Sequence, residues 1–312
     1  MNRPYTVIPT SGWTREEWLE ARRTLGIGGS EASAIVGMSR YDSPMSVWLR
    51  KTGRIPQKDV GDAAEWGNIL EPIVAEHWAK KTGRKIRNRK VMLRSIEWPW
   101  MLANVDRWVL KDETEEEALL EVKTGGYFRL KEWDDGRVPD EYAVQMQHYL
   151  AVTGYRRIYY AALIGGQHPI DGHIDRDEDA IAALVKLERD FWTLVENDTP
   201  PAVDGRDETA DYLLSLYPDG DPSKQVTLPP DIFTRYDEAK MQADAAEERL
   251  NLVKNEARSL IGEAVRGVHG DRKVNWTNVP YNKFDTTRFK EEHPDLYAAY
   301  LNSGTTRRLT FS

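Results

Sequence analysis

The sequence predicts an α/β protein with a central mixed sheet, followed by a smaller helical α+β extension. Apolar residues recur every three to four positions up to residue 81, which indicates helices. Over residues 85–123 they recur at every second position, which indicates strands. A helical pattern at 141–152 and a β-branched, aromatic run at 157–164 then add a helix and a central strand. This order of elements is typical of an α/β domain.

Three short helices are predicted before residue 52. Thr14-Arg-Glu-Glu17 is a capping box that starts a helix over 13–23. After the glycines at 26–29, Ser30 is predicted to cap a second helix over 31–36. Pro44 suits the first turn of a third helix over 44–51.

A longer amphipathic helix is predicted over 63–81, where Pro72 should introduce a kink and Gly83 should end the helix. Three strands and a further helix complete the domain. The predicted strands span 85–94, 100–110 and 118–123, the last two joined by an acidic loop over 112–117, and the helix spans 177–196.

The chain is predicted to divide into a domain over 1–212, a linker over 213–230 and an extension over 231–312. The linker is rich in Pro, Gly and Asp, which favour turns. The extension begins with one long charged helix over 231–265, and short strands at 273–279 and 307–311 flank a helical segment.

Composition excludes several kinds of chemistry. The 312 residues contain no Cys, which excludes disulfides, thiolate zinc sites, iron–sulfur clusters and Cys nucleophiles. No apolar run approaches the ~20 residues of a membrane span, and no signal-peptide pattern precedes residue 12, so a cytoplasmic protein without membrane contact is expected. No Walker-type phosphate loop is present, so ATP use is not indicated.

The net charge of −8 argues against nonspecific coating of nucleic acid, although residues 1–100 hold 17 Lys and Arg against 11 Asp and Glu. The densest basic stretch is 80–94. It fits a phosphate-facing surface and a solvated strand and turn equally well.

One carboxylate pair and a lysine form the strongest candidate site. In Leu119-Leu-Glu121-Val-Lys123, alternation along a strand puts Glu121 and Lys123 on one face and Leu120 and Val122 on the other. Asp106, at the end of the preceding apolar strand, is placed to join them. Two converging carboxylates suit a hard divalent cation, which lowers the pKa of water and neutralises charge on a phosphate. The alternative is a surface strand carrying an ion pair.

Two helices offer additional polar groups. Gln145 and Tyr149 are four residues apart and therefore share a helix face, where they suit the positioning of water or the edge of the core. Glu71 lies beside the apolar face of the helix over 63–81. It is either a third carboxylate of the site or a solvated helix glutamate.

Five collinear motifs resemble those of the YqaJ-type viral recombinase family, which is related to lambda exonuclease within the PD-(D/E)xK nuclease superfamily. The resemblance covers about residues 12–200. The motifs are Arg23 to Ser33 around the glycines, Gly67-Asn-x-x-Glu71-Pro, Asp106, Glu121-Val-Lys123 and Gln145-x-Gln-x-Tyr149.

The resemblance implies a three-layer, restriction-endonuclease-like core and hydrolysis of DNA that depends on Mg²⁺ or Mn²⁺. It implies 5′-to-3′ digestion of one strand from a duplex end, which releases 5′-phosphomononucleotides and leaves a 3′ overhang. A single-strand annealing protein is then an expected partner, a homotrimer is one expected assembly, and a phage or prophage in a bacterial cytoplasm is the expected setting.

The resemblance also implies roles for individual residues. It makes Asp106, Glu121 and the Val122 carbonyl metal ligands, and Lys123 the group that acts on water. Glu71 and Gln145 would complete the site, with Tyr149 in support. Arg23 and Ser30 would hold the terminal 5′-phosphate, and Arg40 would contact DNA.

Three features depart from the family pattern: the long acidic gap between Asp106 and Glu121, Arg107 after the aspartate, and the extension beyond residue 217. The acidic loop should project away from DNA. Two alternatives therefore stay open: an endonuclease of the same superfamily, and a DNA-binding subunit without catalysis.

Overall fold

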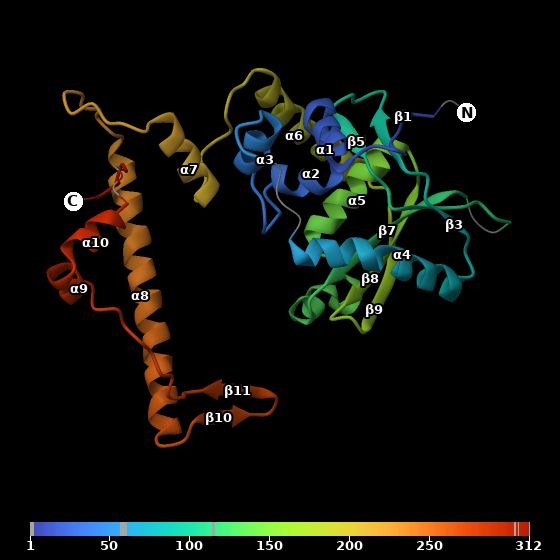
Figure 1. Ribbon diagram of the computed structural model, residues 1–312. Helices are drawn as coiled ribbons and strands as arrows, with labels where there is room; N and C mark the ends of the chain where they lie inside the picture. The colour runs from blue at the N-terminus through green and yellow to red at the C-terminus, as the bar shows by residue number, and fades with distance from the viewer. Residues whose placement is uncertain (1–2, 57–60, 114–115, 303, 305, 312) are drawn as a thin grey trace. The chain divides into compact units, whose positions relative to one another are not determined.

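The chain forms two compact units, Met1–Leu213 and Leu214–Ser312. The structure is a computed structural model, and it describes residues 3–56, 61–113, 116–302, 304 and 306–311. Residues 114 and 115 of the predicted acidic loop lie outside the described residues. Figure 1 shows the elements of both units along the chain.

A five-stranded mixed sheet forms the centre of the first unit. Its order is β3-β6-β7-β8-β9, and β7 and β8 are parallel while the other neighbouring pairs are antiparallel. The strands are β3 (Ile86–Arg87), β6 (Arg107–Val109), β7 (Ala118–Gly125), β8 (Arg157–Ile164) and β9 (His168–Asp175). The predicted mixed sheet is therefore present, and β9 is a strand that the sequence pattern did not indicate.

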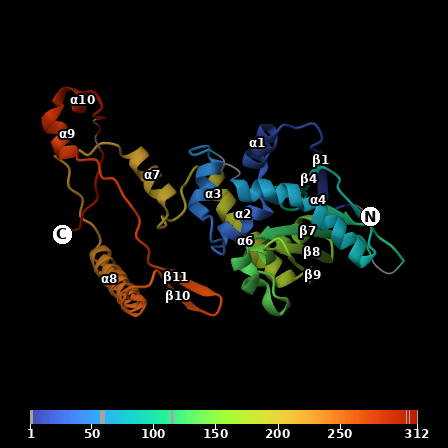
Figure 2. The same cartoon turned by 60° about the horizontal axis from the view of Figure 1, so that its bottom comes forward.

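Helices cover both faces of this sheet. On one face, α4 (Asp62–Thr82) packs Val74 and Trp78 against Leu120 and Val122 of β7. On the other, α5 (Asp140–Thr153) packs against Leu119 in a larger core. Figure 2 shows α4 beside strands β7, β8 and β9. The predicted alternation along β7 is confirmed, because neighbouring residues of the strand belong to different cores.

A second sheet of four strands has the order β1-β4-β5-β2. The strands are β1 (Tyr5–Pro9), β2 (Ile27–Gly28), β4 (Val91–Ser95) and β5 (Met101–Ala103). The predictions of single strands over 85–94 and 100–110 are wrong, because each segment bends and crosses from one sheet to the other. The first passes from β3 to β4, and the second passes from β5 to β6.

The N-terminal helices match the sequence pattern in most respects. The helix α1 (Arg15–Leu25) has the Thr14–Glu17 capping box, and α3 (Pro44–Lys51) has the predicted bounds. The predicted Ser30 cap is wrong. The helix α2 (Gly29–Ile35) starts after Gly28, whose N–H donates to Glu31 at 2.8 Å.

The remaining helices of this unit include two that were not predicted. The predicted helices over 63–81, 141–152 and 177–196 are confirmed as α4, α5 and α6 (Glu178–Glu196); α4 continues through Pro72 and ends at Gly83. A 3₁₀ helix, η1 (Tyr127–Gly136), and α7 (Asp207–Leu216) were not indicated.

The second unit consists of exposed elements. Its elements are α8 (Pro230–Ile261), the antiparallel pair β10 (Arg266–His269) and β11 (Arg272–Asn275), α9 (Thr286–Glu292) and α10 (Pro294–Ala299). No described residue of its three helices is buried. The predicted strand over 307–311 is wrong: the described part forms no strand there, and the ring of Phe311 stacks 3.8 Å from that of Tyr236.

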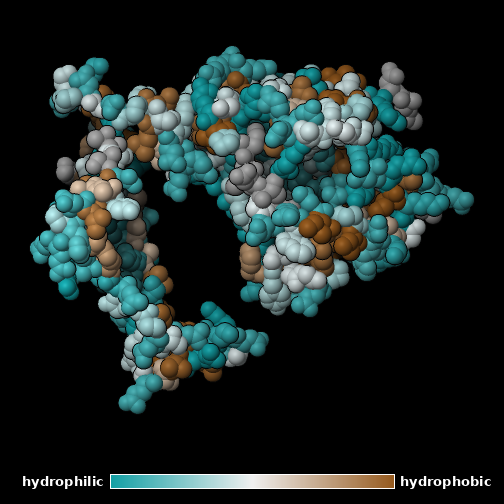
Figure 3. Space-filling model, viewed as in Figure 1, coloured by the Kyte–Doolittle hydropathy of each residue, from teal (hydrophilic) through white to brown (hydrophobic). Residues whose placement is uncertain are grey.

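The surface in Figure 3 is mainly hydrophilic, with apolar patches in both units. Among the described helices, none combines the length and the apolar character needed to cross a membrane.

A buried ion pair connects α5 and α6 beneath the second sheet. His148 Nδ1 lies 2.7 Å from Glu188 and Nε2 lies 2.8 Å from the Leu102 carbonyl oxygen, and both side chains are fully buried. Burial alone would lower the pKa of His148, but Glu188 and the Leu102 carbonyl raise it, with a further contribution from Glu31. Since acceptors face both ring nitrogens, the folded state favours the imidazolium.

This pair predicts that the protein loses stability at alkaline pH. The pKa of His148 is higher in the folded state than its ordinary value of 6.5, so its stabilisation is complete below about pH 6.5. That stabilisation is lost as the pH rises through the folded-state pKa. We expect Glu188→Gln to cost about 3 kcal/mol at pH 6 and to flatten this decline.

Urea unfolding between about pH 6 and pH 9 measures both effects, and Asp190→Asn, an exposed change on the same helix, is the control. Equal slopes in wild type and Glu188→Gln would contradict the assignment.

Candidate active site

Strand register places Asp106 beside Glu121. Asp106 directly precedes β6, and in the antiparallel β6–β7 pair Arg107 is opposite Leu120, so Asp106 lies next to Glu121 of β7. Asp106 lies in the bend where the chain leaves β5, and its Oδ2 accepts the Val122 N–H at 2.8 Å. The bend thus frees this carboxylate to reach β7.

A chain of hydrogen bonds joins β7 to α5. Lys123 Nζ donates to Glu121 Oε1 at 2.7 Å and to Gln145 Oε1 at 2.9 Å. Gln145 Nε2 donates to the same Glu121 oxygen at 2.7 Å and to the Tyr149 hydroxyl at 3.0 Å. Lysine is solely a donor, so it fixes which end of the Gln145 amide faces it. Four residues named by the sequence pattern therefore form one network.

Tyr149 also lies against Gly29, the first residue of α2. A Cβ added at Gly29 would lie 2.4 Å from Tyr149 Cε1, so that position needs glycine. Burial, with help from Glu121 and Asp106, raises the pKa of Tyr149 well above 10, which keeps the phenol protonated.

The carboxylates are in an unfavourable electrostatic environment. Burial, together with Glu121 and Glu71, raises the pKa of Asp106 well above its usual range. Burial also raises the pKa of Glu121, although Lys123 opposes this shift. Burial would lower the pKa of Lys123, but Glu121 and Asp106 outweigh it and raise that pKa. The ionised forms of Asp106 and Glu121 are therefore disfavoured, and Lys123 offsets only part of their mutual repulsion.

Glu71 approaches this centre from α4 but is already paired. Its Oε1 accepts from the buried Arg107 guanidinium, which also donates to the Asp106 carbonyl oxygen at 2.7 Å. Arg107 differs from the family pattern at this position, and here it binds both Glu71 and the backbone of Asp106. Arg107 could not be assigned from spacing alone, because its partner lies on a distant helix.

The residues at this centre fit a divalent cation. Glu121 Oε2 is buried and has no hydrogen-bond partner among the described residues, and a hard cation would both satisfy that oxygen and offset the repulsion from Asp106. The described residues contain no ready-made group of three or more acidic or His side chains around one metal position. One reason is that Glu71 is held in an ion pair by Arg107.

A surface cleft of about 410 Å³ opens beside these carboxylates. Glu71 and Asp106 line it, together with Asn104, whose buried Oδ1 has no partner. Its other lining residues are Val105, the segment from Thr10 to Trp13 after β1, and Asn88, Lys90 and Val91 at the start of β4. The cleft gives a ligand access to the carboxylates from solvent.

The resemblance implies that Arg23 and Ser30 both hold a terminal 5′-phosphate, and in this structure their side chains bind different partners. Arg23 donates to Glu20 through Nε and Nη2, at 2.7 and 2.6 Å. Arg22 instead donates to the exposed Ser30 hydroxyl at 3.0 Å. Adjacent residues point in directions about 100° apart on a helix, so only one of the two arginines can face Ser30.

A buried lysine supports this arrangement. Lys51 Nζ donates to the carbonyl oxygens of Arg22 and Gly26 at 2.7 and 2.6 Å and pairs with Glu31 at 2.8 Å. Although burial opposes it, the charges of Lys51 and Arg22 lower the pKa of Glu31 to about 2. With two cations against one carboxylate, the group carries a net positive charge beside Ser30.

Arg40 lies apart from this group and forms an ion pair with Glu132 at 2.8 Å. Both residues line a cleft of about 610 Å³ near the start of α5. The structure thus holds Arg40 by an acidic neighbour and does not bring it to Ser30.

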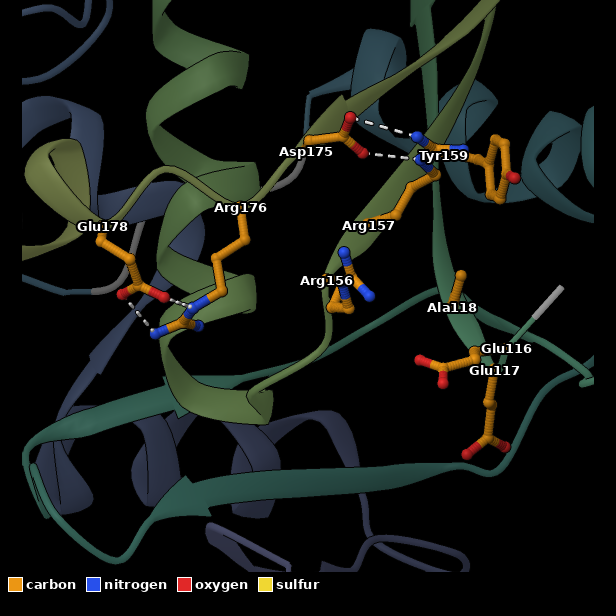
Figure 4. Close-up of a pocket in the computed structure, with 9 residues that line it drawn as sticks. All are labelled: Glu116, Glu117, Ala118, Arg156, Arg157, Tyr159, Asp175, Arg176 and Glu178. Carbon is orange, nitrogen blue, oxygen red and sulfur yellow. Dashed lines mark hydrogen bonds and ion pairs between the residues drawn. The ribbon is translucent and has the colours of Figure 1, made fainter.

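A further cavity of about 470 Å³ lies where β8 begins and β9 ends (Figure 4). It is rich in charge, but Arg157 pairs with Asp175 and Arg176 pairs with Glu178, each at 2.6 Å. Its lining also includes Glu116, Glu117 and Arg156, so four carboxylates face three guanidiniums. This balance does not favour an anionic ligand.

The chain resembles known proteins in sequence. Residues 17–156 match the YqaJ-like viral recombinase domain. The chain is 36% identical to the uncharacterized protein YqaJ of Bacillus subtilis (strain 168) over 302 residues, which cover 95% of this chain and 93% of that protein.

Two solved structures are similar at lower identity. An alkaline exonuclease from Laribacter hongkongensis matches with a TM-score of 0.47 and 19% identity, over 59% of this chain and 93% of that one. A phage-related exonuclease from Haemophilus somnus 129PT matches with a TM-score of 0.41 and 14% identity, over 56% of this chain and 96% of that one.

Because Asp106 and Glu121 repel each other, we expect loss of the Asp106 charge to raise the stability of the protein and to weaken its binding of a cation. Without divalent ions, we expect Asp106→Asn to raise the free energy of unfolding by about 1 kcal/mol, since it removes one of two neighbouring like charges. With Mg²⁺ at ~100 times its dissociation constant, the wild type should gain about 2.7 kcal/mol and the variant much less.

Urea unfolding in EDTA and in Mg²⁺ measures these changes, with Asp211→Asn, an exposed site, as the control. A variant that is less stable in EDTA, and equally stabilised by Mg²⁺, would show that Asp106 holds no cation.

Proposed function

Because this chain belongs to the YqaJ-like viral recombinase family, we propose that it is a metal-dependent exonuclease that digests one strand of duplex DNA from an end, 5′ to 3′. The products would be 5′-phosphomononucleotides and a 3′ single-stranded overhang. The observation that supports catalysis is the meeting of Asp106, Glu121, Lys123 and Gln145 beside an open cleft. The core would have the three-layer arrangement of restriction endonucleases.

In this proposal Asp106, Glu121 and the Val122 carbonyl hold Mg²⁺ or Mn²⁺, and Glu71 joins them if Arg107 releases it. When bound, such an ion lowers the pKa of water and offsets negative charge on the phosphate. The protein groups have separate tasks. Lys123 donates hydrogen bonds as an ammonium ion, because its carboxylate neighbours raise its pKa, and so it orients water or a phosphate oxygen.

Gln145 and Tyr149 act as positioning residues. The amide of Gln145 is held by Lys123 and in turn holds Glu121, so it restricts both side chains to one arrangement. Tyr149 stays protonated and accepts from Gln145, which anchors the network on α5. Preorganised groups of this kind lower the barrier because they do not reorganise during the reaction.

A terminal 5′-phosphate would bind at Ser30 with Arg22. The guanidinium of Arg22 is partly exposed and already faces the Ser30 hydroxyl, while Lys51 adds positive charge behind it. Arg40 is a further candidate for a DNA contact, after release from Glu132. A single-strand annealing protein and a second or third copy of the chain are proposed partners, in the cytoplasm of a bacterial host of a phage or prophage.

An endonuclease of the same superfamily is the alternative enzyme, and a DNA-binding subunit without catalysis is the alternative without chemistry. Digestion of 5′-phosphorylated, 5′-hydroxyl and closed circular duplexes, in Mg²⁺ and in EDTA, separates the three. The exonuclease releases acid-soluble nucleotides from linear DNA alone. Linearised circles indicate the endonuclease, and no Mg²⁺-dependent product indicates the binding subunit.

Loss of the Lys123 amine should remove catalysis. We expect Lys123→Ala to lower the rate of nucleotide release by about 10²–10⁴-fold, the usual contribution of a positioned proton donor or acceptor. Acid-soluble nucleotide release under single-turnover conditions measures it. Lys186→Ala, an exposed change on α6, should retain the wild-type rate. A Lys123→Ala protein with near-wild-type activity would contradict the assignment.

The two adjacent arginines should differ in their effect on end recognition. We expect Arg22→Ala to lower the preference for 5′-phosphate over 5′-hydroxyl ends by about tenfold, since charged hydrogen bonds to phosphate contribute ~1.5–3 kcal/mol. Arg23→Ala should change the preference less, because Glu20 already occupies its guanidinium. The ratio of initial rates on the two substrates is the measurement, and the opposite ranking would show that Arg23 serves the phosphate.

A further inference from the structure

The cleft beside Asp106 contains a cation that the proposed mechanism does not use. Of the described residues that line the cleft, Lys90 is the only one with a positively charged side chain, and it lines the cleft together with Glu71 and Asp106. The side chain is exposed, and its ammonium group has no protein acceptor among the described residues. We propose that Lys90 binds a backbone phosphate of the DNA strand that enters this cleft, an inference that rests on the proposed nuclease function.

The backbone around Lys90 is held in an unusual conformation. Its φ is +47°, in the left-handed region, where a side chain with a Cβ is unfavourable and glycine is not. Its N–H donates to Asn88 Oδ1 at 2.9 Å. Its carbonyl oxygen accepts from both the N–H and the hydroxyl of Thr10, at 3.1 and 2.8 Å. Three hydrogen bonds therefore fix the backbone position from which the Lys90 side chain projects.

The same hydrogen bonds shape the cleft. Thr10 follows β1 and precedes the turn through Gly12, and the Thr10 carbonyl oxygen accepts the Trp13 N–H at 3.1 Å. The segment from Thr10 to Trp13 that lines the cleft is thus attached to Lys90 through Thr10, and Asp106 and Glu71 line the same cleft. A strained backbone that is held in this way is typical of a functional site.

Charge indicates what the cleft accepts. Two carboxylates line it, so an anionic strand would be repelled unless cations compensate. A divalent ion at Asp106 and Glu121 would compensate at the scissile phosphate. Lys90 would supply the compensating charge for a neighbouring phosphate, which places it in substrate binding and not among the reacting groups.

The substitution Lys90→Gly tests the effect on DNA binding without destabilising the fold. Lys90→Gly deletes the amine and at the same time suits the left-handed backbone, so the protein should unfold at an equal or higher temperature than the wild type. We expect its affinity for a 5′-phosphorylated blunt duplex, with Ca²⁺ in place of Mg²⁺, to fall about 3–10-fold at ~0.1 M salt. The slope of log affinity against log salt should decrease by ~0.9, the value for one phosphate contact.

Two further variants complete the experiment. Lys90→Arg retains the charge and should retain the salt slope, and Lys186→Ala removes the same charge outside the cleft and should bind as the wild type does. The inference is overturned if Lys90→Gly binds with wild-type affinity and slope, or if Lys186→Ala loses as much. These results leave the nuclease function intact wherever wild-type protein digests linear DNA in Mg²⁺. A wild-type protein that neither binds nor digests the duplex overturns both proposals.

Discussion

The pairing of β6 with β7 brings Asp106, the residue before β6, next to Glu121, and the rest of the site is arranged around the repulsion of these two carboxylates. A pair of this kind, close together and largely removed from solvent, destabilises the fold unless positive charge lies nearby. Lys123 on the same strand supplies one charge and Arg107 on the neighbouring strand supplies another, through Glu71. The remaining buried oxygen of Glu121 has no hydrogen-bond partner in the described part of the chain, which is the property that favours a cation.

Two segments, β3–β4 and β5–β6, cross between the sheets, and their bends place charged residues at the cleft. Because the chain bends at Asp106, that carboxylate is not held within a strand and reaches the Val122 N–H. Because the earlier segment bends at Lys90, this lysine and the residues after β1 line the same cleft as Asp106. Each bend thus interrupts a strand, and each places a charged residue where a substrate could reach it.

Around Ser30, too, one charged residue connects several elements of the structure. Lys51 is fully buried, yet it bonds to two carbonyl oxygens and a carboxylate at the junction of α1 and α2. That junction determines which arginine of α1 faces Ser30. The cavity where β8 begins and β9 ends is the contrasting case, because the arginines that line it are already paired with carboxylates.

Local pattern was sufficient for the elements whose signals lie within a few residues of each other. The Thr14–Glu17 capping box, Pro44 in the first turn of α3 and the alternation over Leu119 to Lys123 each predicted what the structure contains, since caps and periodicity act through neighbouring residues. The sequence by itself thus determined that Glu121 and Lys123 share a face and that Gln145 and Tyr149 lie on one helix. Tertiary structure alone decided that Asp106 lies next to Glu121, that Arg107 holds Glu71, and that Arg22 rather than Arg23 meets Ser30. These contacts depend on strand register and on the direction in which a side chain leaves its helix, and both are set by packing between segments far apart in the chain.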